Sequence, residues 1–134
     1  MLRQDNQKSI LVVDPDRNGR ASLVEILRGQ GFLIVEAESE GEAIWKLLLR
    51  AQPLSPKRQF SVVYIHYPLL RFGKSLIKEI CRRSEFCQIP VVATSEVDGD
   101  QFWNVMRTWG VAGIFCKPLV TGAVRQSLKQ AYRR

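Results

Sequence analysis

Short apolar runs alternate with helix-like segments five times along the chain, and this alternation most restricts the possible folds. Predicted strands lie at residues 9–13, 32–35, 60–65, 90–93 and 111–116, and helical periodicity at 17–30, 39–48, 73–83, 98–109 and 121–132. A strand–helix–strand unit needs a parallel strand pair with a right-handed crossover. The pattern therefore predicts an α/β fold with an open, doubly wound parallel sheet.

Chain length and cysteine content limit the classes of protein to which this chain can belong. A chain of 134 residues suits one hydrophobic core, so we expect a single domain over residues 1–134 with a flexible N-terminus at 1–8. No apolar run approaches the roughly 18 residues of a transmembrane helix, and the polar start lacks an apolar signal segment. Three cysteines and one histidine make neither a disulfide framework nor a zinc site. We expect a protein of the reducing cytoplasm.

The net charge of +7 is unevenly distributed. Residues 1–42 hold 5 basic and 8 acidic side chains, whereas residues 43–134 hold 15 basic and 5 acidic ones. Several of the basic residues recur at helical spacing: Arg71, Lys74, Lys78, Arg82 and Arg83. We interpret them as a solvated helix face, with binding of an anionic partner such as nucleic acid as the alternative.

Polar residues follow the predicted strands, where ligands of doubly wound sheets bind. Asp14 and Asp16 follow the first strand, Thr94 and Ser95 the fourth and Lys117 the fifth. The third strand is followed by no acid, since the next one along the chain is Glu79. Two carboxylates on one turn make a poor Mg²⁺ site, so we favour capping of the first helix as their role.

Signatures of catalysis are absent from the sequence. It contains neither a phosphate-binding loop, nor a dinucleotide-binding glycine motif, nor a serine nucleophile elbow. The lone His66 has no neighbouring acid in the sequence and is predicted to pack or hydrogen-bond at a strand end. We therefore do not expect an enzyme.

Three segments together resemble the receiver domain of bacterial two-component response regulators: ILVVDPDRNGR, PVVATSE and GVAGIFCKPL. The resemblance extends over about residues 10–131, and its most specific element is Lys117-Pro118 at the end of the fifth strand. It implies a flavodoxin-like (CheY-like) sheet with strand order 2-1-3-4-5 and five helices.

The chemical positions of that family are altered here. The resemblance implies two adjacent acids after the first strand, but Asp14 is followed by Pro15, and Asp16 is one residue further on. It implies an acceptor aspartate ending the third strand; counting back from Pro68 gives Tyr64, and counting forward from Phe60 gives His66. The remaining positions correspond to Ser95 or Thr94 for the switch hydroxyl, Lys117 for the phosphoryl contact, Ile114 or Phe115 for the aromatic switch, and Pro118 as a cis-proline candidate.

The resemblance implies a degenerate receiver, or pseudo-receiver, that binds no cofactor and holds Mg²⁺ weakly or not at all. Such a domain works by phosphorylation-independent docking to a signalling protein. The first alternative is a basic nucleic-acid-binding protein, and the second is a phosphoacceptor using His66 or Tyr64. Lys117 is expected to pair with another group, with Asp14 as the candidate.

The family's docking face consists of the fourth helix, fifth strand and fifth helix. In the helix at 98–109 an apolar stripe is expected to pack on the sheet: Phe102, Val105, Met106 and Trp109. Trp103 falls at the edge of this stripe, and Arg107 lies one turn further on. We predict that Trp103, with Arg107 and Phe102, anchors a homodimer or another protein partner.

Overall fold

The computed structural model describes residues 8–66, 74–86, 88–95, 100–116 and 121–132. For residues 74–75, 100–103 and 115–116 it describes the backbone alone. The strands are β1 (Ser9–Val13), β2 (Leu33–Ala37), β3 (Val62–His66), β4 (Val91–Ser95) and β5 (Gly113–Cys116). The helices are α2 (Arg17–Arg28), α3 (Glu40–Ala51), α4 (Lys74–Arg82), α5 (Asp100–Thr108) and α6 (Thr121–Tyr132).

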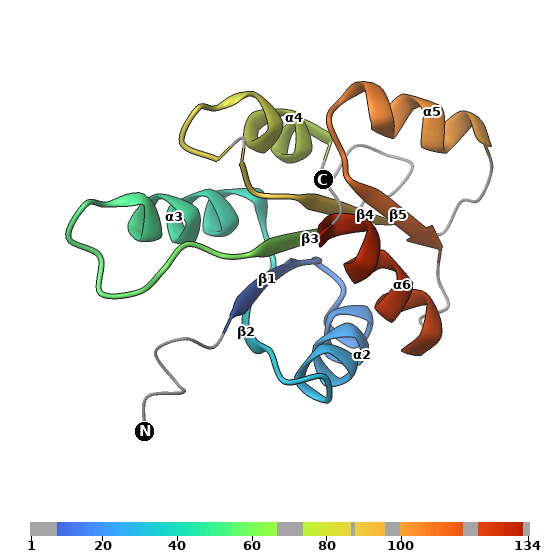
Figure 1. The fold of residues 1–134 in the computed structure, drawn as a ribbon, viewed down its shortest axis with the longest axis horizontal. Helices are drawn as coiled ribbons and strands as arrows, with labels where there is room; N and C mark the ends of the chain where they lie inside the picture. Colours follow the sequence, from blue (N-terminus) through green and yellow to red (C-terminus); the bar gives the residue numbers. More distant parts are fainter. Residues whose placement is uncertain (1–7, 67–73, 87, 96–99, 117–120, 133–134) are drawn as a thin grey trace.

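The five strands form one parallel sheet in the order β2-β1-β3-β4-β5, as the sequence predicts. Figure 1 shows α2 and α6 on one face of this sheet and α3, α4 and α5 on the other. Side chains on β1 alternate accordingly: Ile10 and Val12 pack towards α2 and α6, and Leu11 and Val13 towards the other three helices. Burial on both faces explains why the central strands β1, β3 and β4 are largely apolar.

Two side-chain caps fix the starts of the first two helices. Oδ2 of Asp16 accepts a hydrogen bond from the backbone N–H of Gly19 (3.0 Å) at the start of α2. Oγ of Ser39 accepts one from the N–H of Glu42 (3.1 Å) at the start of α3. These bonds satisfy backbone donors that have no partner within the helix. The predicted capping box is present, except that Glu42 accepts from the N–H of Glu38 rather than from that of Ser39.

Several predicted boundaries are displaced by one to three residues. β2 runs two residues further than predicted because Glu36 and Ala37 pair with Val12 and Val13. β3 begins at Val62 rather than Phe60, because its pairing with β1 starts at Val62, which lies opposite Ile10. β5 begins at Gly113, since the N–H of Val111 still bonds the end of α5.

One core prediction in α5 is wrong. Val105 is 46% exposed, although the helical stripe predicts that it packs on the sheet. Met106 is fully buried and Trp109 packs against the core from the turn after α5. The short helix therefore turns a narrower face towards the sheet than its apolar pattern predicts.

Candidate functional site at the carboxyl edge of the sheet

Four polar residues lie buried at the carboxyl ends of the central strands. Asp14 directly follows β1, His66 ends β3, and Thr94 and Ser95 end β4. Each has less than a tenth of its surface exposed. Parallel strands bring their carboxyl ends to one edge, which is why residues so distant in sequence meet here.

His66 and Thr94 are neighbours across β3 and β4. They are paired in the sheet register, and Nδ1 of His66 lies 3.2 Å from Oγ1 of Thr94 in a buried hydrogen bond. Ser95 is the next residue along β4, so its side chain is directed to the opposite face of the sheet. Thr94, one of the two hydroxyls that the sequence offers as the switch residue, thus contacts the end of β3.

Tyr64 lies within the core, two residues before the end of β3. Its hydroxyl is 2.8 Å from Oγ of Ser127 on α6, and the tyrosine is 1% exposed. Burial raises the pKa of Tyr64 well above its ordinary value, although the hydrogen bond with Ser127 works in the opposite direction. The tyrosine hydroxyl therefore joins the sheet to α6 and is not exposed at the carboxyl edge.

The two aspartates after β1 are occupied by local hydrogen bonds. Oδ1 of Asp14 accepts from the backbone N–H of Asp16 (2.9 Å), while the carboxylate of Asp16 caps α2. The capping role predicted from the sequence is confirmed for Asp16. Since the exposed Pro15 separates them, the two carboxylates do not stand on adjacent residues.

Arg20 occupies this edge of the sheet, and the sequence analysis missed it. Nη1 of Arg20 donates to the backbone oxygen of Asp14 (2.7 Å), and Nε contacts Oε1 of Glu36 at 2.9 Å. A second cation, Lys46, bonds Oε2 of Glu42 (2.9 Å) and the backbone oxygen of Glu36 (2.6 Å). Glu36 and Glu42 border a cavity of about 260 Å³. Arg20 and Lys46 neutralise the negative charge of these two carboxylates. The acidic run at residues 36–42, which begins within β2 at Glu36, was the available signal.

A metal centre is not formed in the described part of the chain. None of its histidines, cysteines, aspartates and glutamates come together as a group of three or more able to hold a metal ion. The sequence adds that no acid occurs between residues 43 and 78, a span that includes all of β3 and the connection after it. The β3 side therefore supplies no carboxylate for Mg²⁺.

The other predicted site residues divide into three groups. Lys117 and Pro118 lie outside the described residues, so their predicted roles and the pairing of Lys117 with Asp14 are untested. For Phe102, Trp103 and Phe115 only the backbone is described. Ile114 is partly buried against the core. Nη2 of Arg107 donates to Oδ1 of Asn104 (2.9 Å) on the exposed side of α5.

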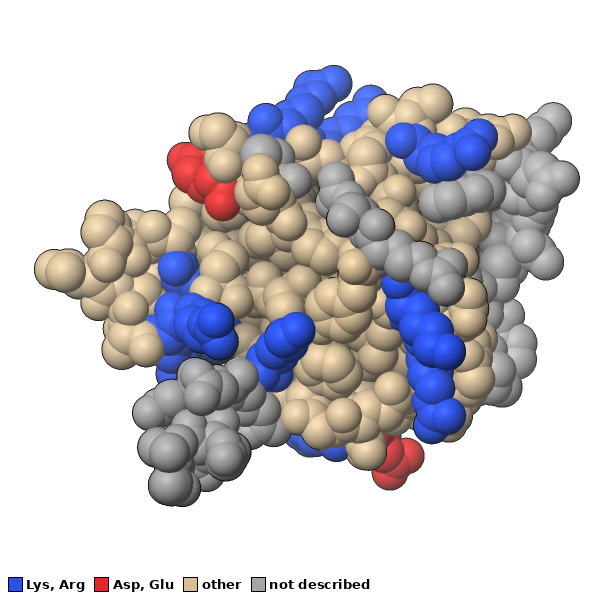
Figure 2. All heavy atoms as spheres, in the orientation of Figure 1, with Lys and Arg blue, Asp and Glu red and all other residues tan. Residues whose placement is uncertain are grey.

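Basic side chains do not form one continuous surface on the face seen in Figure 2; they lie in several separate groups. On and after α4, Arg83 contacts Glu79 (2.8 Å) and Glu85 (3.5 Å), and Lys78 lies over the ring of Trp109. Arg71 lies outside the described residues, and the side chain of Lys74 is not described. Of the remaining members of the predicted basic helix face, Arg83 thus contacts acids, Lys78 contacts an aromatic ring, and Arg82 is exposed.

No protein-family model matches the sequence, and no curated protein sequence matches it. Solved structures do match. The chemotaxis response regulator CheY4 of Vibrio cholerae gives a TM-score of 0.78 at 17% identity, over 93% of this chain and 98% of that one. A two-component response regulator from Clostridium difficile gives 0.75 at 23% identity, over 96% and 98%. The receiver domain of NtrX from Brucella abortus gives 0.77 at 21% identity, over 92% and 98%.

These structures agree with the present one over nearly the full length of both chains, in spite of their low identity. At such identity the likeness establishes the fold and leaves the chemistry to be argued from the residues. None of the described helices is both long and apolar enough to cross a membrane. The strand order, the arrangement of helices on the two faces and the structural matches lead to one conclusion: the chain has the fold of response-regulator receiver domains.

Proposed function

We propose that this protein is a degenerate receiver domain of two-component signalling, which is not an enzyme and acts by phosphorylation-independent docking to another protein. The observation that carries the proposal is the end of β3, where a buried histidine hydrogen-bonds Thr94. A receiver forms an acyl phosphate on an aspartate at that place, and an imidazole cannot do so. His66, rather than Tyr64, is the residue in the degenerate acceptor position, with Thr94 beside it.

The β1 side supports the same proposal. Mg²⁺ requires oxygen ligands that are free to coordinate it, preferably from more than one carboxylate. Asp16 is used in capping α2, and Pro15 has no side-chain oxygen. Asp14 alone is a poor magnesium site, so binding is expected to be weak or absent. Without the metal and the acceptor aspartate, phosphoryl transfer lacks both its charge neutralisation and the carboxylate nucleophile of a receiver.

The partner is expected to be a protein of a signalling pathway. The matched structures bear the names of chemotaxis and two-component response regulators, which act within such pathways. A homodimer through α5, β5 and α6 is one form that the docking can take. The cytoplasm remains the expected compartment, based on the cysteine content.

Beryllofluoride with Mg²⁺, a mimic of the phosphoryl group, tests the proposal directly. We expect no change in the melting temperature or in the amide NMR spectrum, because the acceptor carboxylate is missing. An ordinary receiver domain with its acceptor aspartate serves as the positive control. A saturable shift in this protein, or incorporation of phosphate from acetyl phosphate, would contradict the proposal.

Nucleic-acid binding, the alternative function, has only the net charge of +7 as support. Such binding would weaken steeply with salt, because it releases counterions from the phosphates. A titration of unrelated duplex DNA at low and at physiological salt distinguishes the two functions.

A further inference from the structure

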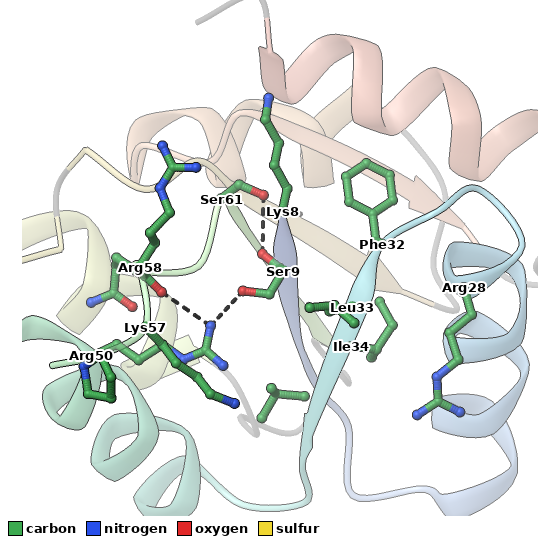
Figure 3. Close-up of a pocket in the computed structure, with 13 residues that line it drawn as sticks. Lys8, Ser9, Arg28, Phe32, Leu33, Ile34, Arg50, Lys57, Arg58 and Ser61 are labelled. Carbon is green, nitrogen blue, oxygen red and sulfur yellow. Dashed lines mark hydrogen bonds between the residues drawn. The ribbon is translucent and has the colours of Figure 1, made fainter. Parts of the chain in front are cut away.

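A second cavity, of about 970 Å³, lies at the opposite end of the sheet from the carboxyl edge. It is bordered by the amino ends of β1 and β2, the outer side of β2 and the connection from α3 to β3 (Figure 3). Among the described residues, five cationic ones line it and no acidic one does: Lys8, Arg28, Arg50, Lys57 and Arg58. We refer to it as the basic pocket.

Arg50 is the most firmly held cation of the basic pocket. Its Nη1 donates to Oγ of Ser9 (2.5 Å) and to the backbone oxygen of Arg58 (3.3 Å), and its guanidinium lies 4.0 Å from the ring centre of Phe60. Its described partners are thus a hydroxyl, a carbonyl and an aromatic ring, none of them a carboxylate. Partial burial lowers the pKa of Arg50, because the charged form loses contact with water. An incoming carboxylate would compensate this loss.

Beside these cations, the outer edge of β2 has backbone groups that a further strand can pair with. β2 is the outermost strand on its side, with β1 as its partner in the described sheet. The N–H of Leu33 donates to the backbone oxygen of Lys8 (3.1 Å), so strand alternation directs the N–H and C=O of Ile34 away from β1. The backbone oxygen of Glu36, on the same outward side, accepts from Lys46. Leu33 is 48% exposed and lines the basic pocket together with Ile34 and Val35.

We propose that the basic pocket binds an extended acidic peptide of a partner protein, which pairs with the outer edge of β2 and places carboxylates against Arg50, Lys57 and Arg58. Strand addition uses backbone hydrogen bonds for affinity and alternate side chains for selectivity. The aliphatic side chains of β2 suit the apolar residues of such a peptide. A single nucleic-acid strand would need stacking platforms, and Phe32 is the one aromatic residue among the described residues that line the pocket.

This inference deepens the proposed function by naming a class of partner, and it rests on that function in taking the chain to act by docking. The basic pocket lies at the opposite end of the sheet from the carboxyl edge. The beryllofluoride test measures binding at the carboxyl edge only. Failure of peptide binding would leave the result of that test unchanged, so the two proposals fail separately.

Fluorescence anisotropy with a labelled peptide of alternating Glu and Val residues tests the inference on the full chain. We expect saturable binding, backbone amide shifts concentrated in residues 33–35, and no binding of the matched Lys–Val peptide. Lys57 and Arg58 are exposed, so the double variant K57E/R58E should fold and weaken binding about tenfold or more. The control variant R82E/R125E has the same change of net charge, at exposed positions outside the pocket, and should bind as the unaltered protein does.

Two further probes separate strand addition from general attraction of anions. A peptide with Pro at the central Val positions keeps its charge but loses backbone donors, and should bind at least about tenfold more weakly. A twelve-residue oligothymidine should bind more weakly than the Glu–Val peptide. The inference is overturned if the Glu–Val peptide does not bind, if the proline peptide binds equally well, or if oligothymidine binds more tightly.

Discussion

The hydroxyl of Tyr64 lies 2.8 Å from Oγ of Ser127, and this buried contact joins β3 to α6. Tyr64 is a core residue, whereas His66, two residues later, ends the strand beside Thr94. The sheet register is consistent with this difference, since Val12 pairs with Tyr64 and Val13 with Ile65. Asp14 therefore follows β1 at about the level of His66.

Restoring the missing carboxylates should restore metal binding at one position of β3 and not at the other. We expect the double variant P15D/H66D to show saturable Mg²⁺ binding in a calorimetric titration, because its new acids stand at the carboxyl edge near Asp14. The matched variant P15D/Y64D places a carboxylate in the apolar core, so it should bind no metal and lose stability. Magnesium binding by P15D/Y64D, or by neither variant, would contradict the assignment of His66.

The contact between Tyr64 and Ser127 should contribute measurably to stability. Removing the tyrosine hydroxyl in Y64F should lower the free energy of unfolding by about 1 kcal/mol, the usual net value of such a hydrogen bond. Oγ of Ser127 keeps its bond to the backbone oxygen of Val124 (2.6 Å), so the loss should not be larger.

Urea unfolding of Y64F, S127A and the double variant measures this coupling. We expect the double variant to lose less than the sum of the single variants, since each single change removes the same bond. Strict additivity would show that the two hydroxyls do not interact in solution.

The hydrogen bonds at Glu42 should make stability depend on pH in the acidic range. The pKa of Glu42 is held below its ordinary value of 4.5, first by the N–H of Glu38 and then by Lys46. A carboxyl with a lowered folded-state pKa stabilises the fold above its unfolded pKa, and this contribution disappears as pH falls through the folded pKa. The side chain is 36% exposed, so the effect should remain below about 1 kcal/mol.

Urea unfolding of the variant Glu42→Gln at several pH values measures this contribution to stability. The variant should unfold at lower urea concentration than the unaltered protein at pH 7, and the difference should shrink as the pH falls below 4.5. Glu25→Gln, on the exposed side of α2, serves as a control that should show little difference at either pH. A constant difference for Glu42→Gln across this range would indicate that the side chain acts by packing rather than by charge.

The sequence predicted the fold far better than the details of the site. Five alternations of strand and helix lead to a doubly wound sheet, and the caps at Asp16 and Ser39 are local signals. The acceptor position in β3 was left open because the strand is buried on both faces, so no alternation of polar and apolar residues marks its register. The position of Arg20 and the basic pocket both depend on contacts between separate helices and strands. The spacing of residues along the chain does not predict such contacts.

Trp103 lies on α5, and the structure describes only its backbone. Three residues that follow it on the helix have exposed side chains, Asn104, Val105 and Arg107, while Met106 enters the core. This part of α5 thus presents an open face next to β5. Tryptophan is enriched among residues that dominate interface energies. If Trp103 anchors a homodimer, Trp103→Ala should weaken self-association by more than about 1 kcal/mol and leave the melting temperature of the monomer unchanged.

Sedimentation equilibrium over a range of protein concentrations measures this association. Trp45→Ala is the matched control, because Trp45 is 60% exposed on α3, outside the predicted face. A dimer through α5, β5 and α6 requires that Trp45→Ala associates as the unaltered protein does and that Trp103→Ala does not. Equal weakening by both variants would instead indicate general hydrophobic contact. Loss of folding in Trp103→Ala would show that this tryptophan belongs to the core, because an exposed anchor contributes to the complex and not to the isolated domain.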